Sequence, residues 1–148
     1  MVTRNGQSIR FSESDVRDMG RSASGVNGIK LKNGDKIAGA DVVGVKDKEG
    51  ELLIVMSRGY AKRTKLKFYK CQRRAGSGIK TAKVTAKTGE VVSARILDPL
   101  EQDLIVVSQK GQIIRTAIGG VSVLGRATQG VRVMKMKEGD QISSITTL

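Results

Sequence analysis

"LLIVMSRGYAKR" runs from Leu52 to Arg63 and contains two strand-like segments joined by a tight turn. The first segment, Leu52 to Met56, is apolar throughout, as is its counterpart Leu104 to Val107 later in the chain, which is typical of strands buried on both faces. The turn Ser57-Arg58-Gly59 follows, and the second segment ends on Arg63. Two such segments joined through a glycine turn predict a β-hairpin.

The same hairpin pattern recurs twice more in the chain. The motif Gly-x-x-x-Arg is found at Gly6–Arg10, Gly59–Arg63 and Gly111–Arg115, with spacings of 53 and 52 residues. Two further sets of residues recur at the same spacing in all three copies. They are the pairs Gly20-Arg21, Arg73-Arg74 and Gly125-Arg126, and the glycines Gly25, Gly78 and Gly130. Self-similarity at a fixed period is the signature of a repeat architecture.

Each repeat is predicted to hold about four strands. After the hairpin comes a third strand, Gly25 to Leu31 in the first repeat, and a glycine turn then opens a fourth. The fourth strands follow Asn33-Gly34, Thr88-Gly89 and Glu138-Gly139 and end near Val43, Leu97 and Leu148. Ser12 to Gly20 could form a helical turn, although its counterparts lack a helical pattern. We therefore expect one all-β, propeller-like domain over 1–148, with blade repeats at about 1–50, 51–102 and 103–148.

Composition agrees with many short strands and an aliphatic core. The 148 residues are 39% hydrophobic and only 3% aromatic, with 18 glycines and one proline. There is no apolar run of about eighteen residues and no apolar N-terminal signal, so we expect neither membrane insertion nor secretion. The single cysteine, Cys71, cannot form an internal disulfide, which fits a reducing cytoplasm.

The charge points to a polyanionic partner. The net charge is +13, and a field of that sign attracts nucleic acid or an anionic membrane. The middle repeat dominates, with twelve cations and four acids, a net charge of +8 against +2 and +3 in its neighbours. Its loop Gln72–Gly78 sets two arginines beside small residues, and such a loop lets a phosphate backbone come close.

Three segments together resemble the C-terminal domain of the DNA gyrase A subunit. They are "RFSESDVRDMGRSASGVNGIKLKNGDKI" (10–37), "SRGYAKRT" (57–64) and "VSVLGRATQGVRVMKMKEGD" (121–140), and the likeness covers essentially the whole chain. The nearest match is to the last three of that domain's six blades, and the second choice is the topoisomerase IV A subunit. Gln72–Gly78 also matches five positions of the gyrase box Gln-Arg-Arg-Gly-Gly-Lys-Gly, departing at Ala75 and Ser77.

The resemblance implies a β-pinwheel, a disc of four-stranded blades in which neighbours exchange a strand. It implies that a basic outer rim binds and bends or wraps duplex DNA within a bacterial type IIA topoisomerase that supercoils DNA, in the cytoplasm at the nucleoid. It also implies that DNA cleavage and ATP hydrolysis belong to the ATPase subunit of the holoenzyme together with other domains of gyrase A. This chain would be a piece of a six-bladed disc that needs no cofactor.

The candidate DNA-binding residues are the cations of the repeated loops and of the middle repeat. They are Arg21, Lys62, Arg63, Lys65, Lys70, Arg73, Arg74, Lys80, Lys83, Arg115, Arg126 and Arg132. Structural roles compete with this interpretation, because Arg10, Arg63 and Arg115 could instead pair with acids or cap strand ends between blades. Tyr60 and Tyr69 are expected to pack in the core rather than to stack on bases.

Other classes of function fit the sequence less well. The chain has no histidine, so a Ser-His-Asp triad or a histidine metal site is impossible, and no GxxxxGK[ST] loop is present. Neither Tyr60 nor Tyr69 follows an arginine, as the topoisomerase nucleophile does. A protein-interaction scaffold would carry a neutral or mixed rim.

Three blades are expected to form an open arc or to self-associate, for example as a six-bladed ring, and we favour the arc.

Overall fold

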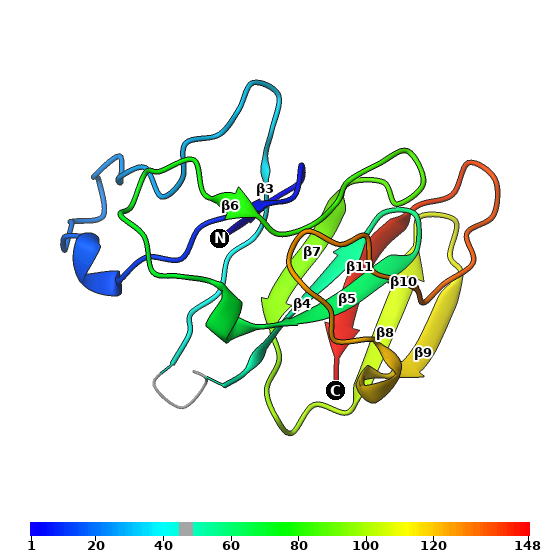
Figure 1. Cartoon of the computed structure of the whole chain (residues 1–148). Helices are drawn as coiled ribbons and strands as arrows, with labels where there is room; N and C mark the ends of the chain where they lie inside the picture. Colours follow the sequence, from blue (N-terminus) through cyan, green and yellow to red (C-terminus); the bar gives the residue numbers. More distant parts are fainter. Residues whose placement is uncertain (45–48) are drawn as a thin grey trace.

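The computed structural model describes residues 1–44 and 49–148 and is all-β, built from three antiparallel sheets (Figure 1). We call residues 1–50, 51–102 and 103–148 units 1, 2 and 3. Unit 1 holds β1 (Val2–Thr3), β2 (Gln7–Ser8) and β3 (Ile37–Gly39). Unit 2 holds β4 (Glu51–Met56), β5 (Tyr60–Lys65), β6 (Ile79–Lys80) and β7 (Val91–Ile96). Unit 3 holds β8 (Asp103–Ser108), β9 (Ile113–Ala117), β10 (Val131–Arg132) and β11 (Ile142–Thr147).

Neighbouring units exchange a strand, as the pinwheel expectation requires. The strand orders are β3-β1-β2-β6, β10-β5-β4-β7 and β11-β8-β9. Strand β6 of unit 2 therefore completes the sheet of unit 1, and β10 of unit 3 completes the sheet of unit 2. The predicted hairpins and fourth strands are confirmed: β4 pairs antiparallel with β5 and β7, and β8 pairs with β9 and β11.

The apolar run of β4 lies between two cores. Its alternate residues Leu52, Ile54 and Met56 join the cluster shared with unit 1, while Leu53 and Val55 join the cluster shared with unit 3. All five are at most 7% exposed, which confirms the prediction of a strand buried on both faces. Each such side chain contributes roughly 1.5–3 kcal/mol when fully buried. The cores thus lie at the boundaries between units, and stacking of units holds the array together.

Three expectations need correction. Gly25–Leu31 forms no strand, because the equivalents β6 and β10 pair with the preceding unit and unit 1 has no preceding unit within these residues. Within the described residues the sheet of unit 3 has three strands rather than four. Strand β8 is buried mainly on one face, since Leu104 and Val106 are inaccessible while Ile105 and Val107 are half-buried.

The helical turn in unit 1 has counterparts in the other units. It is the 3₁₀ turn η1 (Glu13–Asp15), and η3 (Leu66–Phe68) and η4 (Ile118–Gly120) lie at the same place in units 2 and 3. The sequence does not reveal these counterparts, because a single 3₁₀ turn has no apolar periodicity to detect. Each turn follows the hairpin, and in units 2 and 3 it leads into a loop that lies against the preceding unit.

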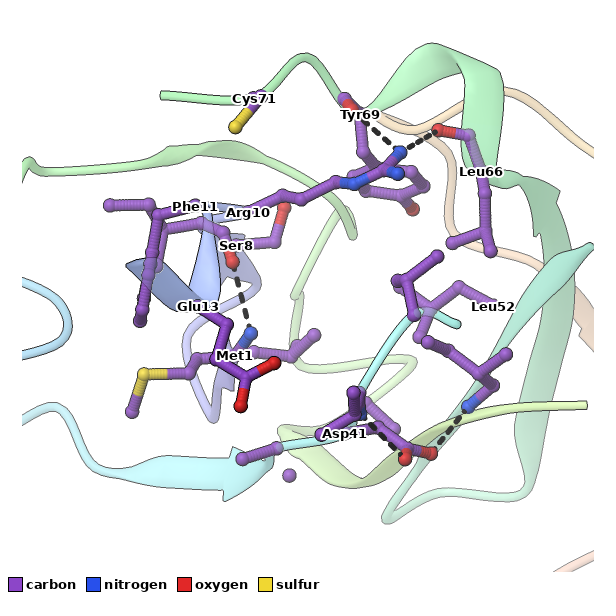
Figure 2. A pocket seen from close by; sticks show the side chains of 18 of the residues that line it. Met1, Ser8, Arg10, Phe11, Glu13, Asp41, Leu52, Leu66, Tyr69 and Cys71 are labelled. Carbon is purple, nitrogen blue, oxygen red and sulfur yellow. Dashed lines mark hydrogen bonds between the residues drawn. The ribbon is translucent and has the colours of Figure 1, made fainter. Parts of the chain in front are cut away.

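A cavity of about 580 Å³ lies between units 1 and 2 (Figure 2). Its lining is mainly apolar, including Val2, Leu52 and Leu66, with Arg10 and Asp41 as charged members. The repeat register aligns the two-residue β1 with the last two residues of the six-residue β4. The cavity lies beside this short strand, since Met1 and Val2 are among its lining residues.

Candidate nucleic-acid interface

In two of the three Gly-x-x-x-Arg motifs, the arginine connects one unit to the next. Arg63 donates to Glu51 Oε2 at 2.8 Å within its hairpin, and to the Val121 carbonyl at 2.7 Å and the Gly119 carbonyl at 3.4 Å in unit 3. Arg10 repeats the second role, donating to the Leu66 and Tyr69 carbonyls at 3.4 Å each (Figure 2). Both arginines therefore have the structural role that the sequence offered as an alternative to DNA binding. The guanidinium of Arg63 is occupied by protein contacts.

Arg115 repeats only the contact within its own hairpin. Its guanidinium pairs with Asp103 at 2.5 Å, and hydrogen bonding to this carboxylate raises the pKa of Arg115 above its usual value. Because its side chain is 68% exposed, this ion pair contributes little to stability and leaves much of the guanidinium accessible.

The structure gives Lys62, a predicted DNA contact, a buried position with protein partners. Its side chain is inaccessible to solvent, and its ammonium donates to the carbonyls of Gly125 and Arg126 and to Thr128 Oγ1. Burial, followed by the nearby Arg126 charge, lowers the pKa of Lys62 to about 8. A phosphate cannot reach an ammonium enclosed in this way.

A signal for this buried lysine was present in the repeat. Lys62 lies three residues after Gly59, where the other two units carry Ile9 and Ile114. Ile9 is 2% exposed, so the position belongs to the inner face of the hairpin. In unit 2 a lysine takes that place and uses its ammonium to hold the loop of residues 125–130 from the next unit.

The loop Gln72–Gly78 lies against unit 1 and presents one free arginine. The Ala75 N–H donates to the Gly28 carbonyl at 2.8 Å, and the Lys30 N–H donates to the Gly76 carbonyl at 2.9 Å. Arg74 is tethered as well, with Nε 3.0 Å from the Asp15 carbonyl and a second nitrogen 2.6 Å from the Asn27 carbonyl. Arg73 is exposed and has no side-chain partner among the described residues, so it is free to meet a phosphate.

The equivalent loop 125–130 lies against unit 2. Besides the Lys62 contacts, the Lys83 N–H donates to the Thr128 carbonyl at 3.0 Å, which places exposed Lys83 beside this loop. Arg126 in the same loop is half-buried. The structure thus brings Lys83 and Arg126 to the boundary of units 2 and 3, as it brings Arg73 to the boundary of units 1 and 2.

The other candidates divide between free and partnered cations. Arg21, Lys70 and Lys80 are exposed and have no side-chain partner in residues 1–44 and 49–148. Lys65 lies 3.2 Å from Glu51 and remains 45% exposed. Arg132 donates to the Tyr60 hydroxyl at 3.3 Å and lies 5.8 Å from the ring centre. Within that part of the chain, the candidates that are both free and exposed are therefore Arg21, Lys70, Arg73, Lys80 and Lys83.

Both tyrosines are core residues, as expected. Tyr60 is 6% exposed and Tyr69 5%, and the Tyr69 hydroxyl shares a 2.7 Å hydrogen bond with Thr81 Oγ1. Burial raises the pKa of Tyr69 above its usual value. Neither ring can serve as a platform on which a base stacks.

The described residues hold neither a cluster of metal ligands nor a membrane-spanning helix. In the part of the chain that the structure describes, no group of three or more His, Cys, Asp or Glu side chains is placed to hold a metal ion. No helix within the same residues is long and apolar enough to span a bilayer.

Known proteins resemble this chain along almost its whole length. The family model described as DNA gyrase C-terminal domain, beta-propeller, matches residues 1–44, 50–98 and 102–148. The gyrase A protein of Staphylococcus epidermidis is 43% identical over 143 residues, 97% of this chain and 16% of that protein. The gyrase A protein of Thermotoga maritima is 39% identical over 140 residues, 95% of this chain and 17% of that protein. The chain thus spans about a sixth of the length of these curated relatives.

Solved structures agree with the family model. A DNA gyrase A C-terminal domain superposes with a TM-score of 0.86 at 31% identity, covering 99% of this chain and 48% of that one. The C-terminal domain of DNA topoisomerase IV superposes with a TM-score of 0.90 at 24% identity, covering 99% of this chain and 45% of that one, which shows the shared fold. The chain belongs to the DNA gyrase C-terminal domain, beta-propeller family.

Proposed function

We propose that this chain binds duplex DNA without sequence preference on a basic outer rim and bends or wraps it, as part of a gyrase-like type IIA topoisomerase. The observation that carries the proposal is the set of free, exposed cations that follow the 3₁₀ turns, with Arg73 and Lys83 beside the two unit boundaries. The excess of thirteen positive charges supports it. Because the chain belongs to the gyrase family, DNA is the polyanion that we expect it to bind.

The same surface is suited to contact with DNA phosphates rather than with bases. Lysine and arginine in loops meet the DNA backbone, which carries no sequence information directly. The described residues form strands and 3₁₀ turns only, so they present no helix for the major groove. With both tyrosines buried, single-strand recognition by stacking has no platform either.

In this proposal the chain binds DNA and performs no chemistry. Its partners are the remaining domains of gyrase A and the ATPase subunit, which supply cleavage and ATP hydrolysis in the bacterial cytoplasm at the nucleoid. The chain itself uses no cofactor. It holds a curved segment of DNA against its rim. This curvature sets the direction in which one duplex passes through another.

A salt titration tests the mode of binding. Five free cations would each neutralise about one phosphate, at a slope of about −0.9 in log K against log salt for each contact. Fluorescence anisotropy with two unrelated duplexes of about 40 base pairs should therefore give a common slope of about −4 to −5. Affinity that hardly changes between about 50 and 200 mM salt would contradict a phosphate-dominated interface.

A charge-matched pair of variants tests the place of binding. Lys70→Gln with Arg73→Gln removes two free cations, while Arg4→Gln with Arg95→Gln removes two that are paired with Glu90 and Glu101. Both double variants lose the same net charge. The first should weaken binding at least about tenfold and lower the salt slope by about two, and the second should do much less. Equal losses would mean that only net charge matters.

Bending and wrapping need a separate measurement. Relaxed plasmid is incubated with the protein, sealed with ligase, and scored for linking number. A shift in linking number supports wrapping by these three units. Binding without any shift would indicate the behaviour expected of a topoisomerase IV-like domain, which binds DNA without wrapping it.

A further inference from the structure

Two cations converge on Tyr60 at the boundary between units 2 and 3. Arg132, on β10 of unit 3, donates a hydrogen bond to the Tyr60 hydroxyl at 3.3 Å, and its guanidinium lies 5.8 Å from the centre of the ring. Lys87, in the loop that leads to β7, places its ammonium 5.8 Å from the same ring centre. Tyr60 is 6% exposed, whereas both cations are exposed. A buried polar side chain thus lies directly beside two cations that face solvent.

No carboxylate neutralises these two cations. None of the ion pairs between described residues includes Lys87 or Arg132. The acid nearest to Lys87 in the sequence, Glu90, is paired with Arg4 at 2.5 Å. Like charges held beside one ring repel each other, and an anion bound between them offsets that repulsion. The two cations therefore supply the charge that an anion site requires.

The Tyr60 hydroxyl still has its own proton to donate. It accepts from Arg132, and no acceptor for its proton is found in residues 1–44 and 49–148. The hydrogen bond from Arg132, together with the charges of Arg132 and Lys87, lowers the pKa of Tyr60 below its usual value despite burial. A more acidic hydroxyl is a better donor to an anionic oxygen, and such charge-assisted hydrogen bonds are the strong ones.

The loop that carries Lys87 is held in one conformation. Thr88 is inaccessible to solvent, and its hydroxyl accepts a hydrogen bond from the Thr85 N–H at 3.0 Å. The Gly89 N–H donates to the Thr85 carbonyl at 2.9 Å, and the Arg58 N–H donates to the Thr88 carbonyl at 3.0 Å. Because Lys87 lies inside this hydrogen-bonded turn, its backbone is ordered before a ligand arrives, which lowers the entropy cost of binding.

Tyr60, Lys87 and Arg132 lie on the outer side of the array. The strand order in the sheet of unit 2 is β10-β5-β4-β7, and β7 contacts β3 of unit 1 and β11 of unit 3. The inner strands are therefore β3, β7 and β11, and β10 is the outermost strand of this sheet. Arg132 belongs to β10, and Tyr60 lies opposite it on β5. A polyanion that follows the outer rim from unit 2 to unit 3 passes this position.

The boundary between units 1 and 2 has the same plan with weaker groups. There Gln7 lies opposite Lys80, in the register that places Tyr60 opposite Arg132. The repeat also supplies a lysine two residues before the turn glycine in every unit, at Lys32, Lys87 and Lys137. The boundary of units 2 and 3 adds a buried hydroxyl and a guanidinium, whose fork of donors matches the geometry of a phosphate.

We propose that Tyr60, Lys87 and Arg132 form a phosphate site, which holds one backbone phosphate of duplex DNA where the duplex passes from unit 2 to unit 3. The ammonium, the guanidinium and the tyrosine hydroxyl all donate to the unesterified oxygens of that phosphate. Lys87 and Tyr60 thereby join the interface, the tyrosine through its hydroxyl rather than its ring. The assignment rests on the proposed function, because the phosphate it names belongs to DNA.

An isosteric substitution tests the hydroxyl. Tyr60→Phe keeps the ring in the core, so the thermal midpoint should change little. Duplex affinity, measured by fluorescence anisotropy, should fall about tenfold, because a hydrogen bond to a charged group is lost. Tyr69→Phe is the matched control, since the Tyr69 hydroxyl shares its 2.7 Å hydrogen bond with Thr81 inside the core, and DNA affinity should not change. Wild-type affinity in Tyr60→Phe would overturn the proposal.

The salt dependence tests whether the two cations share one phosphate. Lys87→Gln with Arg132→Gln should lower the slope of log K against log salt by about one, because both side chains meet the same phosphate. Cations on separate phosphates would lower it by about two, and an unchanged slope would mean that neither meets DNA. Either of these results overturns a shared site.

The ionisation of Tyr60 reports directly on the site. In an alkaline titration followed by phenolate absorbance, Tyr60 should ionise before Tyr69, whose pKa is raised by burial, and Tyr60→Phe identifies its step. A phosphate beside the hydroxyl disfavours the phenolate, so saturating duplex DNA should raise the pKa of Tyr60 by about 1. Sodium phosphate and sodium chloride at equal ionic strength form the other arms, and only the phosphate should raise this pKa.

The outcomes distinguish this site from the proposed function as a whole. DNA binding that raises the pKa of Tyr60 supports the site. DNA binding that leaves this pKa unchanged overturns the site and leaves the proposed function standing. A rise with inorganic phosphate but not with DNA also overturns it, because the site would then take a free phosphate. Absence of DNA binding by the wild type overturns both.

Discussion

Replacing Lys62 with methionine separates the structural role of this lysine from DNA binding. Methionine has a similar length and no charge, and the equivalent positions in the other units are isoleucines. The Arg126 carbonyl loses the ammonium, at a cost of about 1–3 kcal/mol. The Gly125 carbonyl keeps the Thr128 hydroxyl at 2.8 Å. Removal of a buried charge offsets this loss, so we expect a change within about 2 kcal/mol at pH 7.

The pH dependence of stability gives the sharper signature. Folding lowers the pKa of Lys62 from 10.5 to about 8, so between these values the unfolded chain holds a proton that the folded chain has released. The free energy of unfolding therefore rises with pH across this window, by up to roughly 3 kcal/mol at about 1.4 kcal/mol per pH unit. Below pH 8 both states are protonated and this contribution is constant.

Urea unfolding of the wild type and of Lys62→Met at pH 7, 8, 9 and 10 isolates this contribution, because other titrating groups cancel in the difference. The wild type should gain stability relative to the variant above pH 8. Lys70→Met, which removes an exposed lysine, is the matched control and should show no such trend. DNA affinity should fall for Lys70→Met and stay within about twofold for Lys62→Met. A flat stability difference from pH 7 to 10, or equal losses of affinity, would refute the assignment.

Four further substitutions distinguish free from tethered or strained groups. Arg73→Ala should weaken duplex binding by about 1.5–3 kcal/mol, measured by anisotropy on two unrelated sequences, and leave thermal stability unchanged. Arg74→Ala should in addition lower the midpoint of thermal unfolding by a few degrees, since it removes hydrogen bonds to the Asp15 and Asn27 carbonyls. An unchanged midpoint would contradict a stabilising role for these hydrogen bonds. Ala75→Gly should raise the free energy of unfolding by up to about 1 kcal/mol, because Ala75 has φ 64°; a loss of stability would show that this conformation is not strained. Glu51→Gln should cost about 1–3 kcal/mol in urea unfolding, because it leaves Arg63, 18% exposed, without its acid, and a neutral result would rule out that ion pair as a stabilising contact.

The hairpins could be predicted from sequence because their causes are local. A continuous apolar run, a glycine turn and a period of about 52 residues fix where β4, β5, β8 and β9 lie. The ion pair of Arg63 with Glu51 follows from the same register, since the two residues face each other diagonally across one hairpin. Its repetition as Arg115 with Asp103 shows that the repeat encodes it.

The contacts between units could not be predicted from the sequence. Arg74 meets the carbonyls of Asp15 and Asn27, which lie 59 and 47 residues away. Lys62 meets the loop 125–130 across a similar separation. Each depends on how two units stack, which no local pattern specifies. The loss of a strand at Gly25–Leu31 has the same origin, because that segment becomes a strand only when a neighbouring hairpin pairs with it.

The position of each cation within the repeat, more than its residue type, decides its role. On the strands of the hairpins, every candidate cation meets an opposing group: Lys62, Arg63, Lys65 and Arg115 all do so. Arg63, Lys65 and Arg115 meet an acid across their own hairpin, because a hairpin aligns each residue with cross-strand neighbours. Lys62 instead meets carbonyls of the loop from the next unit. Lys70, Arg73 and Lys83 lie in loops outside any strand and have no such neighbour among the described residues. Fewer of the candidate cations are therefore available to DNA than the sequence suggests, and three of the five free ones, Lys70, Arg73 and Lys83, lie in the loops of unit 2.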